Sequence, residues 1–88
     1  MRCAAPPEKP AWMSSPQAVV VTAERVVAAW PEDGCSWMMH ADAHNGIGDW
    51  STASKSWMKA GKFYGKEGEA ERKAKALRYA GKALEKLR

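Results

Sequence analysis

Large aliphatic side chains are scarce in this chain, and that scarcity limits the folds open to it. The 88 residues include three Leu, one Ile, five Val and one Phe, against sixteen Ala, five Trp and five Met. The first four types together fall well below the roughly 20% under which disorder becomes plausible. Trp buries a large area and Met fills irregular gaps, so a core is still feasible. We expect one small domain with its core built around Trp30, Trp37, Trp50 and Trp57.

The prolines separate an N-terminal arm from this domain. Four of the five lie within residues 1–16. Proline removes an amide donor and biases the preceding residue away from helix. We therefore predict a disordered Pro-rich arm over residues 1–16 and a single small helical domain over residues 17–88. At the junction, Ser15 suits an N-cap and Pro16 suits the first helical position.

The segment after the arm can be interpreted as a helix or as a strand followed by a helix. Val19, Ala23, Val27 and Trp30 recur at helical spacing, with Val26 beside them. The run of three valines instead favours a strand over residues 18–22, with Thr22 capping a shorter helix. The helical period favours the first alternative, and the second stays open.

Three more helices are predicted further along the chain. The first is short, capped by Ser36 and stopped by Asn45–Gly46. The next lies within residues 49–65 and is capped by Ser51 or Asp49. The last lies within residues 66–88, with glutamates in its first turns and basic residues at its end, as the helix dipole prefers. The expected fold is mainly α, a small bundle of three to four helices.

Residues 35–44, CSWMMHADAH, contain the one group of side chains suited to a metal. His40 and His44 are four residues apart, so on a helix they point the same way, and Cys35 could fold back toward them. Structural zinc takes four protein ligands, and the fourth would have to come from Cys3 or Asp49. We therefore expect a half-buried histidine face and no stoichiometric metal. A zinc-stabilised domain is the less favoured alternative.

Enzyme activity is not expected. A nucleophile–base pair of Cys35 and His40 would lack both an orienting third group and an oxyanion site. No glycine-rich phosphate loop follows a predicted strand. The two cysteines and the absence of an apolar leader predict reduced thiols and a cytoplasmic location. No apolar run approaches the roughly 20 residues of a membrane span.

The positive charge belongs to the last third of the chain. Residues 1–34 carry a net charge of −1, residues 35–54 carry −2 and residues 55–88 carry +7. Rows of Lys and Arg suit phosphate backbones, and neighbouring aromatic rings can stack on bases. The alternative is that these charged faces only keep the protein soluble. The candidate nucleic-acid-binding residues are Lys55, Lys59, Lys62, Lys66, Arg72, Lys75, Arg78, Lys82 and Lys86.

These patterns predict a small basic binding module that contacts nucleic acid or a nucleoprotein complex. A helix-turn-helix from Ser36 to Tyr64 would place Thr52, Ser54, Lys55 and Lys59 at a base edge. The alternative function is a protein–protein inhibitor or adaptor, of the kind that phages and mobile elements encode. Its contact surface would be Trp37, Met38 and Met39.

The last helix carries an apolar stripe that could pack against another helix. It could do so within the chain or in a homodimer. Gly81 lies on this stripe although glycine weakens a helix, and a close helix approach there would account for it. The stripe consists of Ala70, Ala74, Leu77, Gly81 and Leu84.

Overall fold

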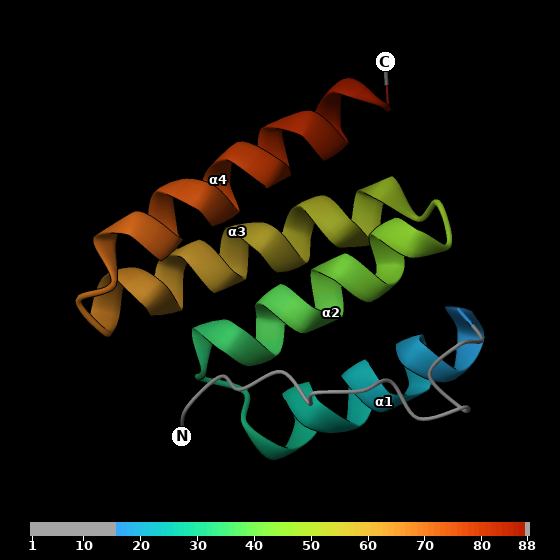
Figure 1. The fold of residues 1–88 in the computed structure, drawn as a ribbon, viewed down its shortest axis with the longest axis horizontal. Coiled ribbons are helices and arrows are strands. Elements are labelled where there is room, and N and C mark those ends of the chain that lie inside the picture. Colours follow the sequence, from blue (N-terminus) through green and yellow to red (C-terminus); the bar gives the residue numbers. More distant parts are fainter. Residues whose placement is uncertain (1–15, 88) are drawn as a thin grey trace.

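The computed structural model describes residues 16–87, and these form a bundle of four helices. They are α1 (Pro16–Ala29), α2 (Gly34–Gly46), α3 (Trp50–Lys66) and α4 (Ala70–Glu85). Figure 1 shows them side by side in chain order, and each packs mainly against its neighbour in sequence. No strand occurs within residues 16–87. The predicted mainly α bundle is confirmed, with four helices.

Helix α1 settles the choice between helix and strand at its start. It runs without a break from Pro16, so the strand alternative over residues 18–22 is wrong. Thr22 Oγ1 donates a hydrogen bond to the Ala18 carbonyl oxygen at 3.0 Å, a contact that a helix allows. The valines follow the helical period, and that period outweighed their strand preference. Ser15 and the rest of the predicted arm lie outside the described residues.

Aspartates cap the next two helices. Asp33 accepts hydrogen bonds from the Cys35 amide at 3.4 Å and from Ser36 Oγ at 3.0 Å. The predicted Ser36 cap is therefore wrong, because the carboxylate upstream takes that role and Ser36 lies inside α2. Asp49 caps α3 by accepting from the Thr52 amide at 3.3 Å. This confirms one of the two predicted caps for α3.

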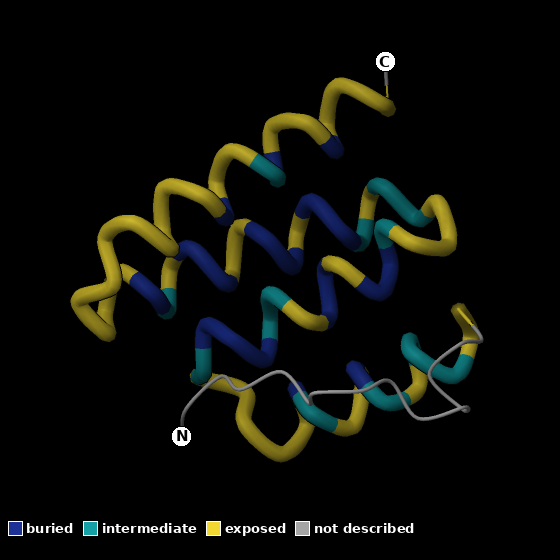
Figure 2. Tube along the Cα trace, viewed as in Figure 1, coloured by how far each residue is buried: buried dark blue, intermediate teal, exposed yellow. Residues whose placement is uncertain are grey.

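The core is built mainly from alanine. Figure 2 shows buried residues concentrated in α2 and α3, with others on the facing side of α4. The completely buried alanines are Ala41, Ala53, Ala60 and Ala76. Such small side chains bring helix backbones close together, so there is little space between them for large rings.

The expectation of a core around four tryptophans is therefore wrong for Trp30 and Trp50, whereas Trp57 belongs to the core and Trp37 packs against it. Trp57 is buried, with 6% of its surface exposed. Trp37 and Trp50 are half-buried. Trp30 is 45% exposed at the end of α1. Tyr64, at 3%, is the other large ring buried in the core.

The close approach between α3 and α4 occurs at Gly61. A Cβ placed there would lie 3.0 Å from Leu77 Cδ2, so only glycine fits without displacing that side chain. A Cβ at Gly81 would meet nothing within 4 Å. The expectation that Gly81 accommodates another helix is thus wrong within the described chain.

Replacing Gly81 with Ala should therefore stabilise the protein. The substitution should raise the free energy of unfolding by up to about 1 kcal/mol, because alanine loses less backbone entropy in a helix. Urea denaturation monitored by circular dichroism measures the change, and Gly61→Ala serves as the crowded comparison. If Gly81→Ala instead lowered stability in a concentration-dependent way, α4 would be pairing with a second copy at this position.

No helix among residues 16–87 has the length and apolar character needed to cross a membrane.

Candidate nucleic-acid interface

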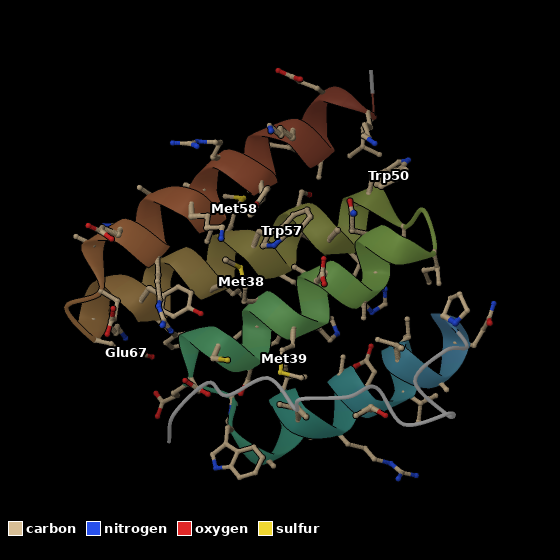
Figure 3. The ribbon with its side chains drawn as sticks, in the orientation of Figure 1. Met38, Met39, Trp50, Trp57, Met58 and Glu67 are labelled. Carbon is tan, nitrogen blue, oxygen red and sulfur yellow. The ribbon has the colours of Figure 1, made fainter. Side chains whose placement is uncertain are left out.

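A hollow of about 490 Å³ opens between α2 and α4, with part of α3 at its base. Met38 packs against the buried cluster that contains Trp57, and both residues are labelled in Figure 3. The lining combines apolar and aromatic side chains with lysines, and its acidic member is Asp42. The lining residues are Met38, Met39, Asp42, Asn45, Trp57, Lys75, Tyr79, Lys82, Ala83 and Lys86.

Lys75 and Lys82 of α4 and Lys86 at its C-cap border this hollow, whereas Arg78 does not line it. Lys75, Arg78, Lys82 and Lys86, here called the α4 basic flank, are all exposed and recur at helical spacing. A second hollow of about 450 Å³ is lined by Lys75, Arg78 and Lys82 together with Tyr79, Ala74 and the acidic Glu71. The α4 basic flank therefore forms a continuous cationic border along one side of the helix.

Aromatic rings lie directly beside these cations. The Nζ atoms of Lys75 and Lys82 are each 5.9 Å from the centroid of the Tyr79 ring. Lys86 Nζ is 4.3 Å from the centroid of the Trp50 ring. Tyr79 in turn packs against Trp57, with ring centroids 5.4 Å apart. The site can therefore offer a phosphate a positive charge and offer a base an aromatic surface.

The lysines of α3 lie elsewhere. Lys55, Lys59, Lys62 and Lys66, here called the α3 basic flank, are on the side of α3 roughly opposite Trp57, given about 3.6 residues per turn. None of the four lines either hollow. The two predicted stripes thus lie on different faces of the molecule.

Local contacts occupy several of the α3 lysines and Arg72. Lys59 Nζ lies 4.3 Å from the Trp37 ring centroid, and Lys66 Nζ lies 5.5 Å from the Phe63 ring centroid. Arg72 is near the start of α4, where its Nε is 3.9 Å from Glu69 Oε2. Arg72 is therefore separate from the hollow that Lys75, Lys82 and Lys86 border.

The residues predicted for protein contact divide among three places. Trp37 is engaged internally, since its Nε1 donates to the Pro31 carbonyl oxygen at 2.7 Å. Met38 and Met39 line the hollow. Leu77 and Leu84 are 44% and 46% exposed and do not line it. Gly81 is also exposed.

The proposed helix-turn-helix does not fit the position of Ser54. This residue is buried, and its Oγ donates to the Ser51 carbonyl oxygen at 2.8 Å. It cannot reach a base edge from there. Helices α2 and α3 instead lie side by side along most of their lengths (Figure 1).

Cys35 is bonded in a disulfide and is 3% exposed. The expectation of reduced thiols is therefore wrong, and the argument for a cytoplasmic location loses that support. A disulfide sulfur is neither the thiolate ligand of a metal nor a nucleophile. Cys3, the other cysteine of the sequence, lies outside the described residues.

The two histidines meet an acidic residue that the sequence did not single out. His40 Nε2 and His44 Nε2 lie 3.0 and 3.1 Å from the same atom, Glu24 Oε1. Burial tends to raise the pKa of Glu24, but hydrogen bonds with the two imidazoles outweigh it and hold that pKa below its ordinary value. Glu24 directly follows Ala23, a residue of the predicted apolar face of α1. This position beside the face was the one hint in the sequence.

No family model, curated protein or solved structure matches this chain. Its function is therefore inferred from the geometry of its own residues.

Proposed function

We propose that this protein is a non-enzymatic module that binds single-stranded nucleic acid through the hollow between α2 and α4. The observation that carries the proposal is the convergence of Lys75, Lys82 and Lys86 on one border of the hollow, next to the Tyr79 ring. Lysines along a groove follow a phosphate backbone, and an adjacent ring stacks on bases of any sequence.

The size of the hollow supports a single strand. Its volume of about 490 Å³ is within the range of about 300–1,000 Å³ found for small-molecule pockets. An unpaired base can enter such a space, whereas a base within a duplex is held in its stack. With three lysines against Asp42, the charged lining residues sum to +2, which attracts an anionic chain.

A protein partner is the second candidate, and the methionines favour it. Met38 and Met39 both line the hollow, and Met39 is 41% exposed. Methionine adapts its shape to different partners and is common at such surfaces. An acidic segment with an apolar side would match both the lysine border and the methionine wall. For this inhibitor or adaptor function we propose Met38 and Met39, without Trp37, as the contact surface.

Binding to a labelled single strand should show the salt dependence of phosphate contacts. About three contacts give a slope of roughly −2 in log affinity against log salt, since a single strand contributes about −0.7 per phosphate. Fluorescence anisotropy with single-stranded and duplex oligonucleotides measures both slope and preference, and the single strand should bind more tightly. If neither form binds at micromolar protein in low salt, the nucleic-acid proposal is wrong and the protein partner replaces it.

A further inference from the structure

We propose that Glu24, His40 and His44 bind a divalent transition-metal ion of the Zn²⁺ type, which fastens α1 to α2. The three residues come from two helices and offer one carboxylate oxygen and two imidazole nitrogens. These are ligand types that Zn²⁺ takes in proteins, and in an open site three protein ligands leave the fourth position to water. The proposal replaces the expectation of no stoichiometric metal, which considered His40 and His44 without Glu24. The site is separate from the hollow, because none of the three residues lines it.

The spacing of the three donor atoms fits a shared ion. All three lie within 4.8 Å of one another, and Glu24 Oε1 is 3.0 and 3.1 Å from the two Nε2 atoms. Zinc binds nitrogen and oxygen at about 2.0–2.2 Å, so tetrahedral ligands stand roughly 3.3–3.5 Å apart. A shift of a few tenths of an ångström in the flexible Glu24 side chain brings its two separations into that range. The two histidine nitrogens lie within 4.8 Å of each other, and small ring rotations set their final separation.

The hydrogen bonds of His44 leave a place for a cation. Its Nδ1 lies 3.2 Å from Asp49 Oδ2 and its Nε2 lies 3.1 Å from Glu24 Oε1, and both carboxylates only accept. A neutral ring carries one hydrogen, so one of its two nitrogens presents a lone pair to a carboxylate oxygen. Two acceptors at this distance repel unless a positive charge lies between them.

The ring of His40 is also held at both nitrogens, although its partner Ser56 has a hydroxyl, which both donates and accepts and so fixes no tautomer. Its Nδ1 lies 2.6 Å from Ser56 Oγ, which leaves Nε2 facing Glu24 Oε1. Metal-ligating histidines usually use the second ring nitrogen in a hydrogen bond that fixes the ring, most often to a carboxylate, a carbonyl or water. Asp49 and Ser56 serve as the two supports here. Both histidine side chains are at least nine-tenths buried, with 7% and 10% exposed, so the rings are held in place.

An ion at this position would strengthen the weakest helix contact of the bundle. Helix α1 packs mainly against α2, and its buried residues are Ala23 and Val27. Two such small side chains hold a helix only weakly, because the free energy gained depends on the apolar area buried. Glu24 is the α1 residue that the two histidines of α2 contact. The Glu24 side chain is 55% exposed, so an ion has access from solvent.

Titration of the chelator-treated full-length chain with ZnCl₂ and CoCl₂ tests the proposal. We expect one equivalent of Zn²⁺ in calorimetry, with Co²⁺ giving visible absorption of four- or five-coordinate nitrogen and oxygen ligation. Imidazole ¹H–¹⁵N spectra should show both Nε2 atoms shifting. Hydrogen exchange should slow in α1 on metal addition, while α3 and α4 change little.

Three substitutions make the result specific. Glu24→Gln should weaken Zn²⁺ at least about tenfold because it removes a charged ligand, and its exposed position lets the variant fold. Ser56→Ala should weaken Zn²⁺ binding about tenfold, because it removes the hydrogen bond that orients the His40 ring. Glu32→Gln removes the same charge from an exposed site near α1 and should have no effect. Absence of saturable binding, or equal affinity in Glu24→Gln and the wild type, would overturn the proposal.

Discussion

Replacing Lys75, Lys82 and Lys86 with Ala should weaken the binding of single-stranded nucleic acid about 100-fold near 0.1 M salt. Each phosphate contact contributes about 0.7 to the salt slope, so three contacts account for roughly two orders of magnitude relative to 1 M salt. The three lysines are exposed and border the hollow, so their removal leaves the buried side of α4 unchanged.

The α3 basic flank provides a control matched in charge. Replacing Lys55, Lys59 and Lys62 with Ala also removes three positive charges, but from a face that the hollow does not reach. We expect this variant to keep its affinity within about threefold, since only long-range attraction is lost. Anisotropy titrations at matched salt compare the affinities of the two variants, and circular dichroism checks that both keep their helix content. Equal losses in both variants would mean that net charge, and not the hollow, determines binding.

Replacing Gly34 with Ala should lower the free energy of unfolding by about 2–3 kcal/mol, because it adds volume to a filled core. A Cβ at Gly34 would lie 2.6–2.9 Å from the Tyr64 ring, which itself is 3% exposed. The Gly34 amide also donates to Glu67 Oε2 at 2.9 Å, and this bond ties the start of α2 to the end of α3. The added methyl group would force both contacts apart.

Thermal unfolding measures this effect, with a Tm decrease of about 10–20 °C for a domain of this size. Gly46→Ala is the matched control, since it makes the same change at the other end of α2, where a Cβ would meet nothing within 4 Å. That variant should unfold within a few degrees of the wild type. An unchanged Tm in Gly34→Ala would show that the Tyr64 ring does not pack on this glycine.

The helices could be predicted from the sequence because their signals are local. Apolar residues at helical spacing identified α1 and α4, and the Asp49 cap lies next to the turn that it closes. The packing face of α4 was predicted wrongly, because the helix packs through Ala76, Ala80 and Ala83 while the whole predicted stripe is exposed. The error at the start of α2 was local. Asp33 and Ser36 are both residue types that favour the N-cap position. Asp33 is the cap of α2, and Ser36 Oγ donates a hydrogen bond to its carboxylate.

The candidate sites depend on contacts between helices, which no local pattern contains. The sequence identified every lysine of the hollow but could not show that the α3 and α4 basic flanks lie on different faces. It identified His40 and His44 but not Glu24, sixteen and twenty positions earlier on another helix. Such pairings are determined by how α1 packs on α2, and that packing rests on alanine and valine, which carry little information about position.

An interior made of methyl groups also determines which mutations the protein can accept. In a leucine-rich bundle, damage comes mainly from truncation, which opens cavities. Here Ala41, Ala53, Ala60 and Ala76 are completely buried and have only a methyl group to lose, so truncation to Gly costs mainly the roughly 1 kcal/mol of helix propensity. Any larger residue at these four positions must push two backbones apart. A saturation mutagenesis scan should therefore show that these four alanines lose more stability on enlargement than on truncation to Gly.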